Sequence, residues 1–167
     1  WFFRTITSDA LLGTAAAKYP IHLCMKTLSI IHVNNDFGVN MLAEFKRAFE
    51  TLGGKIISVT PYNAQQPSYN AEVTNALKGD PPALYFIGYP GDGTTIVRTW
   101  IQQGGPQKFL LNDGMNAADF IKGVGPQFLA NAFGTSSGTS KTASTEFFAS
   151  AYPGMSGGFD AGAPAAD

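Results

Sequence analysis

The chain has 167 residues, of which 44% are hydrophobic and 14% are charged. This length suits one globular domain with a sizeable core. Eleven Lys and Arg face twelve Asp and Glu, and the formal net charge of −1 leaves no basic excess for binding nucleic acid. Cys24 is the single cysteine, which excludes an internal disulfide framework and a four-cysteine zinc site.

The two ends of the chain indicate how it is organised. No apolar run reaches the roughly 18 residues of a membrane span, and no signal peptide is visible. The first residue is Trp1, and residues 154–167 are almost entirely Gly, Ala, Ser, Pro and Asp. We therefore expect a fragment, with a ligand-binding lobe over residues 1–153 and a Gly/Ala/Pro-rich loop or tail over 154–167.

Strand patterns alternate with helix patterns along the first half. Residues 27–33 form a β-branched apolar run, which is typical of a strand covered on both faces. Between residues 41 and 52, apolar side chains recur at helical spacing, and Gly53 and Gly54 end that pattern. In chain order the predicted elements are a helix capped by Asp9, a strand over 27–33, a helix over 41–52 and a strand over 55–59.

The alternation continues in the second half. Ser68 is a candidate cap for a short helix that carries Glu72 in its first turn, where the helix dipole favours an anion. The remaining predicted elements are a strand over 83–87, a helix bearing Ile96 to Ile101, a strand over 108–111, a helix start at 117–121, a strand over 128–133 and a helix over 145–151.

This order of elements predicts the fold class. Strands that alternate with helices form right-handed βαβ units around a parallel sheet. We expect an α/β, three-layer, doubly wound parallel sheet of flavodoxin-like order 2-1-3-4-5. In such sheets a ligand binds beyond the carboxyl ends of the strands, near the first and third strands.

Two residues at these strand ends suit a small cation. Tyr89 follows the third predicted strand and Asp113 follows the fourth. An aromatic face and a carboxylate that converge there would bind an ammonium group. The plain alternative is that both are turn residues, before Pro90 and Gly114 respectively. No nucleophile and base accompany them, so binding without chemistry is the simpler interpretation.

A serine motif offers an alternative from another class of protein. Residues 134–138 match the GxSxG pattern, with Ser136 in the place of the nucleophile. That motif requires a helix directly after the serine and a histidine later in the chain. Here residues 138–141 are polar and loop-like, and both His22 and His32 lie upstream. A polar loop is the favoured interpretation, and an α/β hydrolase using Ser136 is retained as the alternative.

Several segments, taken in order, resemble a known family. They are residues 3–5, 8–9, 29–38, 45–54, 88–93 and 112–115. Their order and spacing are similar to those of the periplasmic solute-binding proteins of branched-chain amino-acid ABC transporters, and the resemblance covers nearly the whole chain. It implies a type I periplasmic-binding fold, in which two α/β lobes joined by a hinge trap the ligand. It identifies this chain as most of the second lobe.

The resemblance also implies site residues. Asp113 matches an acidic residue that binds the ligand's ammonium group, and Tyr89 matches an aromatic residue after the third strand. Phe37 stands where the family usually has Tyr, so the hydroxyl is lost and only packing remains. Asp9 matches an acidic residue near the hinge and the ligand. We expect no catalytic residue, no metal and no cofactor.

The function that the resemblance implies is transport. We expect an extracytoplasmic, monomeric protein that closes around an amino-acid-like ligand and delivers it to an ABC permease in the membrane. The expected location is the periplasm, or the outer surface of a Gram-positive host through a lipid anchor. The alternative with the same fold is a sensor domain for amides or amino acids.

Overall fold

The structure is a computed structural model that describes residues 7–136, 143–144, 146–147 and 150–151. Residues 9–136 form one compact unit, and residues 1–8 with 137–167 are assigned to a second. The described residues from 143 to 151 are helical, in the region where a helix is predicted. The predicted boundary at 153–154 lies outside the described residues. The fold and site below belong to the first unit.

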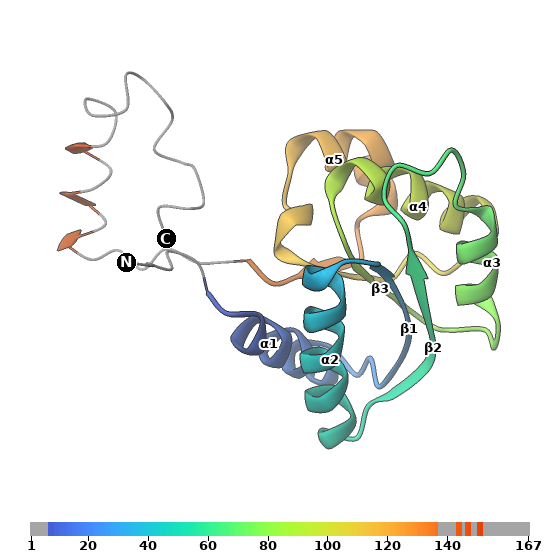
Figure 1. The fold of residues 1–167 in the computed structure, drawn as a ribbon, viewed down its shortest axis with the longest axis horizontal. Helices are drawn as coiled ribbons and strands as arrows, with labels where there is room; N and C mark the ends of the chain where they lie inside the picture. The colour runs from blue at the N-terminus through green and yellow to red at the C-terminus, as the bar shows by residue number, and fades with distance from the viewer. Residues whose placement is uncertain (1–6, 137–142, 145, 148–149, 152–167) are drawn as a thin grey trace. The chain divides into compact units, whose positions relative to one another are not determined.

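The first unit alternates helices and strands (Figure 1). In chain order its elements are α1 (Asp9–His22), β1 (Thr27–Val33), α2 (Asp36–Thr51), β2 (Lys55–Tyr62), α3 (Asn70–Leu77), β3 (Leu84–Ile87), α4 (Pro90–Gln102), β4 (Phe109–Leu111), the 3₁₀ turn η1 (Asp113–Met115), α5 (Ala118–Val124), the 3₁₀ turn η2 (Pro126–Phe128) and β5 (Ala132–Gly134).

The five strands form one sheet in the order β2-β1-β3-β4-β5. Every neighbouring pair in this sheet is parallel. Parallel neighbours point their carboxyl ends to the same edge, so the loops that follow β1, β3 and β4 meet there. The predicted doubly wound sheet and its strand order are confirmed.

Helices cover both faces of the sheet, because its strands bury side chains on both sides. On β1, Leu28 and Ile30 join one apolar cluster, with α1 and α2, while Ile31 and Val33 join the other, with α3, α4 and α5. Successive side chains of a strand point to opposite faces, which explains this division. Figure 1 shows the resulting three layers.

Three local predictions are wrong. Asp9 is the first residue of α1 rather than the cap that precedes it. The predicted strand over 128–133 begins only at Ala132, because Pro126–Phe128 form the 3₁₀ turn η2 after Gly125 at φ 105°. Proline fixes its own φ and lacks an N–H, which favours such a turn over a strand. The cap of α3 is Tyr69 rather than Ser68, whose Oγ accepts the Asn70 N–H at 3.3 Å.

Candidate functional site

The candidate site lies on the edge of the sheet where β1, β3 and β4 end. We call this edge the rim and define it by Asn35, Phe37, Tyr89, Asn112 and Asp113. Because β3 pairs with β1 on one side and with β4 on the other, residues far apart in the sequence become neighbours here. The structure therefore brings together three of the four predicted site residues.

Two aromatic rings meet across the rim. The ring centroids of Phe37 and Tyr89 lie 5.7 Å apart, with the ring planes tilted by 33°. This separation is within the range of favourable aromatic pairs. Tyr89 remains 45% exposed, and Phe37 is half-buried and packed against the core. The Tyr89 ring thus offers an aromatic surface to solvent, while the Phe37 ring beside it is held by packing against the core.

Asn35 connects the end of β1 to this aromatic pair. It is the cap of α2, with its Oδ1 accepting the Gly38 N–H at 3.0 Å. Its Nδ2 donates to the Tyr89 hydroxyl at 3.3 Å. Gly38 is required at this turn, since a Cβ there would lie 2.0 Å from the carbonyl oxygen of Val33. The entry to α2 is therefore tight, and Asn35 has a fixed orientation.

Asn112 performs a similar connection between the ends of β3 and β4. It is buried, and its Oδ1 accepts the N–H of Gly88 at 3.0 Å. Its Nδ2 faces Oδ1 of the half-buried Asp113 at 3.4 Å. A buried amide that satisfies a backbone donor positions the loop on which it sits. Asn112 therefore links Asp113 to Gly88, the residue just before Tyr89.

Two buried tyrosines lie in the sheet close to the rim. Burial raises the pKa of Tyr85, and the negative charge of Asp113 adds to the effect. Burial likewise raises the pKa of Tyr62, with a further contribution from the negative charge of Asp92. The buried Tyr85 hydroxyl has no hydrogen-bond partner among the described residues. Both rings therefore remain neutral and structural, and Asp113 is the rim's anionic group.

Asp9 is the predicted site residue that the structure does not join to the rim. It lies in the first turn of α1, and α1 packs against α2. Within residues 7–136 no hydrogen bond, ion pair or ring contact connects Asp9 with Phe37, Tyr89 or Asp113. Its predicted role near a hinge stays a prediction.

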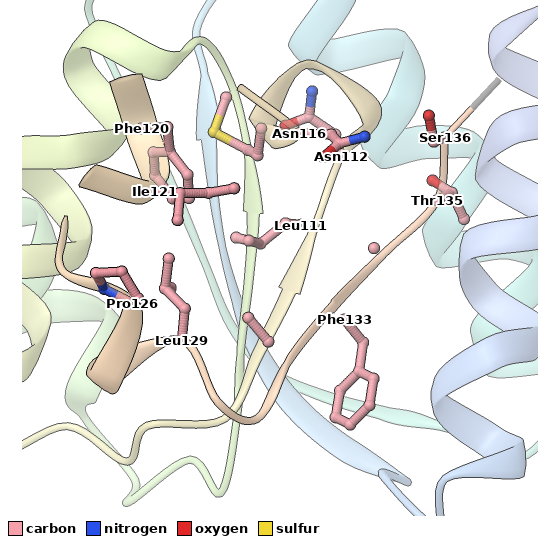
Figure 2. Close-up of a pocket in the computed structure, with 13 residues that line it drawn as sticks. Leu111, Asn112, Asn116, Phe120, Ile121, Pro126, Leu129, Phe133, Thr135 and Ser136 are labelled. Carbon is pink, nitrogen blue, oxygen red and sulfur yellow. The ribbon is translucent and has the colours of Figure 1, made fainter. Parts of the chain in front are cut away.

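A pocket of about 420 Å³ opens beside the rim. Figure 2 shows Asn112 and Asn116 near Thr135 and Ser136 at one end, while apolar side chains line the rest. Those apolar residues include Leu111, Phe120, Ile121, Leu129 and Phe133. Asn112 belongs to both the rim and the pocket, whereas Tyr89 and Asp113 do not line the pocket.

Ser136, the serine of the hydrolase alternative, lines this pocket just after β5. The residues that would form the helix of a nucleophile elbow, 137–142, lie outside the described part of the chain. His32 is buried in β1, and its Nδ1 lies 3.1 Å from the Val33 carbonyl oxygen. Burial lowers the pKa of His32, which keeps this imidazole neutral at pH 7.

Metal ligands and membrane-spanning helices were also sought in the described residues. These residues contain no group of three or more His, Cys, Asp or Glu side chains arranged to hold a metal ion. No helix among them is long and apolar enough to cross a membrane. The side chains that define the rim offer hydrogen bonding, aromatic contact and one carboxylate.

The sequence prediction missed two residues of the rim, Asn35 and Asn112. Asn112 directly follows β4, and Asn35 lies two residues after the end of β1. In each, the side-chain amide accepts one hydrogen bond through its oxygen and donates another through its nitrogen. A sequence signal for Asn35 exists: it lies three residues before Gly38, and a helix cap bonds to the N–H of the third helical residue at this spacing. No sequence signal pointed to Asn112, because its partner Gly88 follows a different strand, β3.

Comparison with known proteins places the chain in a family. The family model for "Periplasmic binding protein" matches residues 1–164. A leucine-, isoleucine-, valine-, threonine- and alanine-binding protein of Pseudomonas aeruginosa is 26% identical over 118 residues, which are 70% of this chain and 32% of the relative. A chemotactic signal transduction substrate-binding protein of Halobacterium salinarum is 29% identical over 97 residues, 56% of this chain and 23% of the relative.

Solved structures agree in fold. The leucine-binding protein LivK of Thermotoga maritima has a TM-score of 0.80 at 22% identity, covering 98% of this chain and 48% of that one. The substrate-binding protein LivJ of Streptococcus pneumoniae, solved with isoleucine, has a TM-score of 0.72 at 18% identity, covering 96% and 47%. The chain thus spans about half the length of these structures and has the fold of one lobe of a type I periplasmic-binding protein. It belongs to the periplasmic binding protein family.

Proposed function

We propose that this chain is part of an extracytoplasmic solute-binding protein of an ABC transporter, and that its rim binds an amino acid. Asp113 accepts hydrogen bonds from the ligand's ammonium group, and Tyr89 and Phe37 contact the ligand from the neighbouring strand ends. The observation that carries the proposal is the convergence of a carboxylate and an aromatic pair on one edge of the sheet.

The names of the relatives support this class of ligand. The Pseudomonas relative is named for binding five amino acids, and the Streptococcus structure contains isoleucine. The rim has the complementary chemistry for an ammonium group, since a carboxylate and an aromatic face both attract cations. It has no Lys or Arg among its defining residues to bind a carboxylate. The proposal therefore assigns most of the partners of the ligand's carboxylate to residues beyond this sequence.

The mechanism follows from the openness of the rim. A carboxylate in contact with water gains little from an ion pair, about 0–1 kcal/mol. Most of a small ligand's surface must be enclosed for tight binding. In the proposed function a second lobe closes over the rim by a hinge motion, and an ABC permease recognises the closed, monomeric protein outside the cytoplasm. The protein performs no chemistry on its ligand.

A second candidate function is sensing, and one relative favours it. The Halobacterium protein is named as the substrate-binding protein of a chemotactic signal transduction system. The same closed form would then be recognised by a receptor rather than by a permease. Deleting the gene separates the two candidates: a transport protein is needed for uptake of labelled L-leucine, whereas a sensor is needed only for the response to it.

The role of Asp113 is tested in a protein that contains this chain and spans the relatives' full length. The Asp113→Asn change keeps the shape of the side chain and removes its charge. A hydrogen bond to a charged group contributes about 1.5–3 kcal/mol, so the Kd for L-leucine should rise by roughly tenfold to a hundredfold or more. Titration calorimetry measures this change.

The matched control is Asp119→Asn, which removes an exposed carboxylate from α5 without touching the rim. It should leave the Kd within about twofold of the wild type. If Asp113→Asn binds L-leucine as tightly as Asp119→Asn does, Asp113 is a turn residue and the proposed site is wrong.

A further inference from the structure

Asn35 is bound at both ends of its side-chain amide, and the two partners differ in kind. Its Oδ1 accepts the N–H of Gly38, which is one of the backbone donors left unpaired at the start of α2. A backbone N–H can only donate, so the oxygen of the amide must face Gly38. The nitrogen must therefore face the Tyr89 hydroxyl, and it donates to that oxygen at 3.3 Å.

This arrangement determines how the Tyr89 hydroxyl is used. A phenol has one hydrogen to donate and an oxygen that accepts. Because the Nδ2 group of Asn35 donates to the Tyr89 oxygen, the hydroxyl's own hydrogen cannot point at Asn35 and must point elsewhere. The Tyr89 hydroxyl donates no hydrogen bond to another of residues 7–136, and the side chain is 45% exposed. The hydroxyl hydrogen of Tyr89 is thus directed to the solvent side of the rim.

We infer that Asn35 is a positioning residue that holds Tyr89 as a hydrogen-bond donor toward an acceptor oxygen of the ligand. This inference rests on the proposed function and deepens it. Phe37 fixes the ring from the side through the aromatic contact, and Asn35 fixes the hydroxyl. Asp113 accepts from the ligand's ammonium group while Tyr89 donates to a carboxylate or carbonyl oxygen. The rim then favours ligands that carry both groups, such as an amino acid, over simple amines.

The test uses Asn35→Ser, because serine caps helices about as well as asparagine but is too short to reach Tyr89. The variant should keep the wild-type unfolding temperature within about two degrees, since the helix cap is retained. In the longer protein, its Kd for L-leucine should rise by about threefold to tenfold, the range expected for one misdirected hydrogen bond. Tyr89→Phe should raise the Kd by at least as much.

The double variant Asn35→Ser/Tyr89→Phe is the decisive measurement. If Asn35 acts through the Tyr89 hydroxyl, removing that hydroxyl first leaves Asn35→Ser with less than a twofold effect. A purely structural role for Asn35 would weaken binding equally in both backgrounds, so losses that multiply would overturn the inference.

A second variant tests the direction of the hydrogen bond. Asn35→Asp keeps the cap and replaces the donor to Tyr89 by an acceptor. The Tyr89 hydroxyl would then donate to residue 35 and be lost to the ligand, so the Kd should rise to the value of Tyr89→Phe. An Asn35→Asp variant that binds L-leucine like the wild type would overturn the inference. The added charge is controlled by making the same change in the Tyr89→Phe background.

These outcomes separate the inference from the proposed function. If Asp113→Asn and Tyr89→Phe weaken binding but Asn35→Ser does not, the site stands and the role of Asn35 is wrong. If none of the three changes affects the Kd for L-leucine, the proposed site is wrong and the inference is overturned with it.

Discussion

The backbone N–H of Gly88 donates to the side-chain Oδ1 of Asn112 over 3.0 Å, and this bond joins the ends of β3 and β4 beneath the rim. Gly88 and Asn112 are both buried. Because the same amide faces Asp113 through its nitrogen, one side chain determines the positions of two strand-end loops. The rim depends on this pair as much as on the residues that would touch a ligand.

Asn112→Ala should destabilise the chain markedly. The change leaves the buried N–H of Gly88 without an acceptor, which costs about 1–3 kcal/mol of unfolding free energy. Urea denaturation measures the loss. Asn116→Ala is the matched control, because Asn116 is exposed and lines the same pocket, and it should change stability by less than about 0.5 kcal/mol. Equal stability of the two variants would show that the Gly88 bond is unimportant.

Gly88→Ala should be similarly damaging, for a steric reason. A Cβ at this position would lie 2.2 Å from the Tyr62 hydroxyl oxygen and 2.7 Å from Cζ of Phe86. Forcing extra atoms into such a packed site costs roughly 1–3 kcal/mol. At Gly91, in the first turn of α4, a Cβ would meet nothing within 4 Å. Gly91→Ala should be neutral or stabilising by up to about 1 kcal/mol; a Gly88→Ala variant that matches it in thermal unfolding would refute the steric argument.

Stability should fall above pH 10, and Tyr85 should account for part of the fall. Burial and the charge of Asp113 raise the pKa of Tyr85 in the folded state, so the unfolded chain loses this proton first. The contribution of protonated Tyr85 to the stability of the fold is complete below about pH 10, the usual tyrosine pKa. It is lost as the pH rises through the pKa of Tyr85 in the folded state.

Tyr85→Phe should therefore reduce the alkaline slope of unfolding free energy by up to about 1.4 kcal/mol per pH unit. It should not destabilise the chain much at pH 7, because the buried hydroxyl has no hydrogen-bond partner within the described part of the chain. Tyr19→Phe, at an exposed tyrosine, is the matched control. Identical slopes for both variants would mean that Tyr85 titrates freely.

On the acid side, the free energy of unfolding should fall as the pH falls, and His32 should account for part of that loss. Burial lowers the pKa of this imidazole below its usual 6.5, so the unfolded chain binds the proton first as the pH falls. The contribution of neutral His32 is present above about pH 6.5 and is lost below it. His32→Gln should flatten the stability curve between pH 6.5 and 5 by up to about 1.4 kcal/mol per pH unit. His22→Gln, at an exposed histidine, is the control, and a wild-type curve that matches His32→Gln contradicts the prediction.

The chain by itself should not bind free L-leucine at micromolar concentration. Tyr89 is exposed and Asp113 only half-buried, so neither group encloses a ligand. Titration calorimetry of this chain alone should show no saturable heat, whereas the protein spanning the relatives' length should. Micromolar binding by the chain alone would place the site elsewhere, for example in the pocket lined by Asn116 and Ser136.

The sequence determined the elements that a local pattern can encode. The apolar run over 27–33 became β1, and the helical spacing of Met41, Phe45 and Phe49 became the buried face of α2. Both patterns depend on neighbours within a few residues, because burial on one face of a helix or on both faces of a strand repeats with a short period. The parallel order of the sheet followed from the alternation of these elements, and it placed Tyr89 and Asp113 on the same edge.

Only the tertiary structure decided which side chains meet on that edge. Asn35 and Tyr89 are 54 residues apart, and Gly88 and Asn112 are 24 apart, so no local pattern relates them. The start of β5 at Ala132 was likewise set by the turn at Pro126. Hydrogen bonds between strand ends depend on the register and packing of the whole sheet, and the free energy that selects them is gained only when the distant segments are already in place.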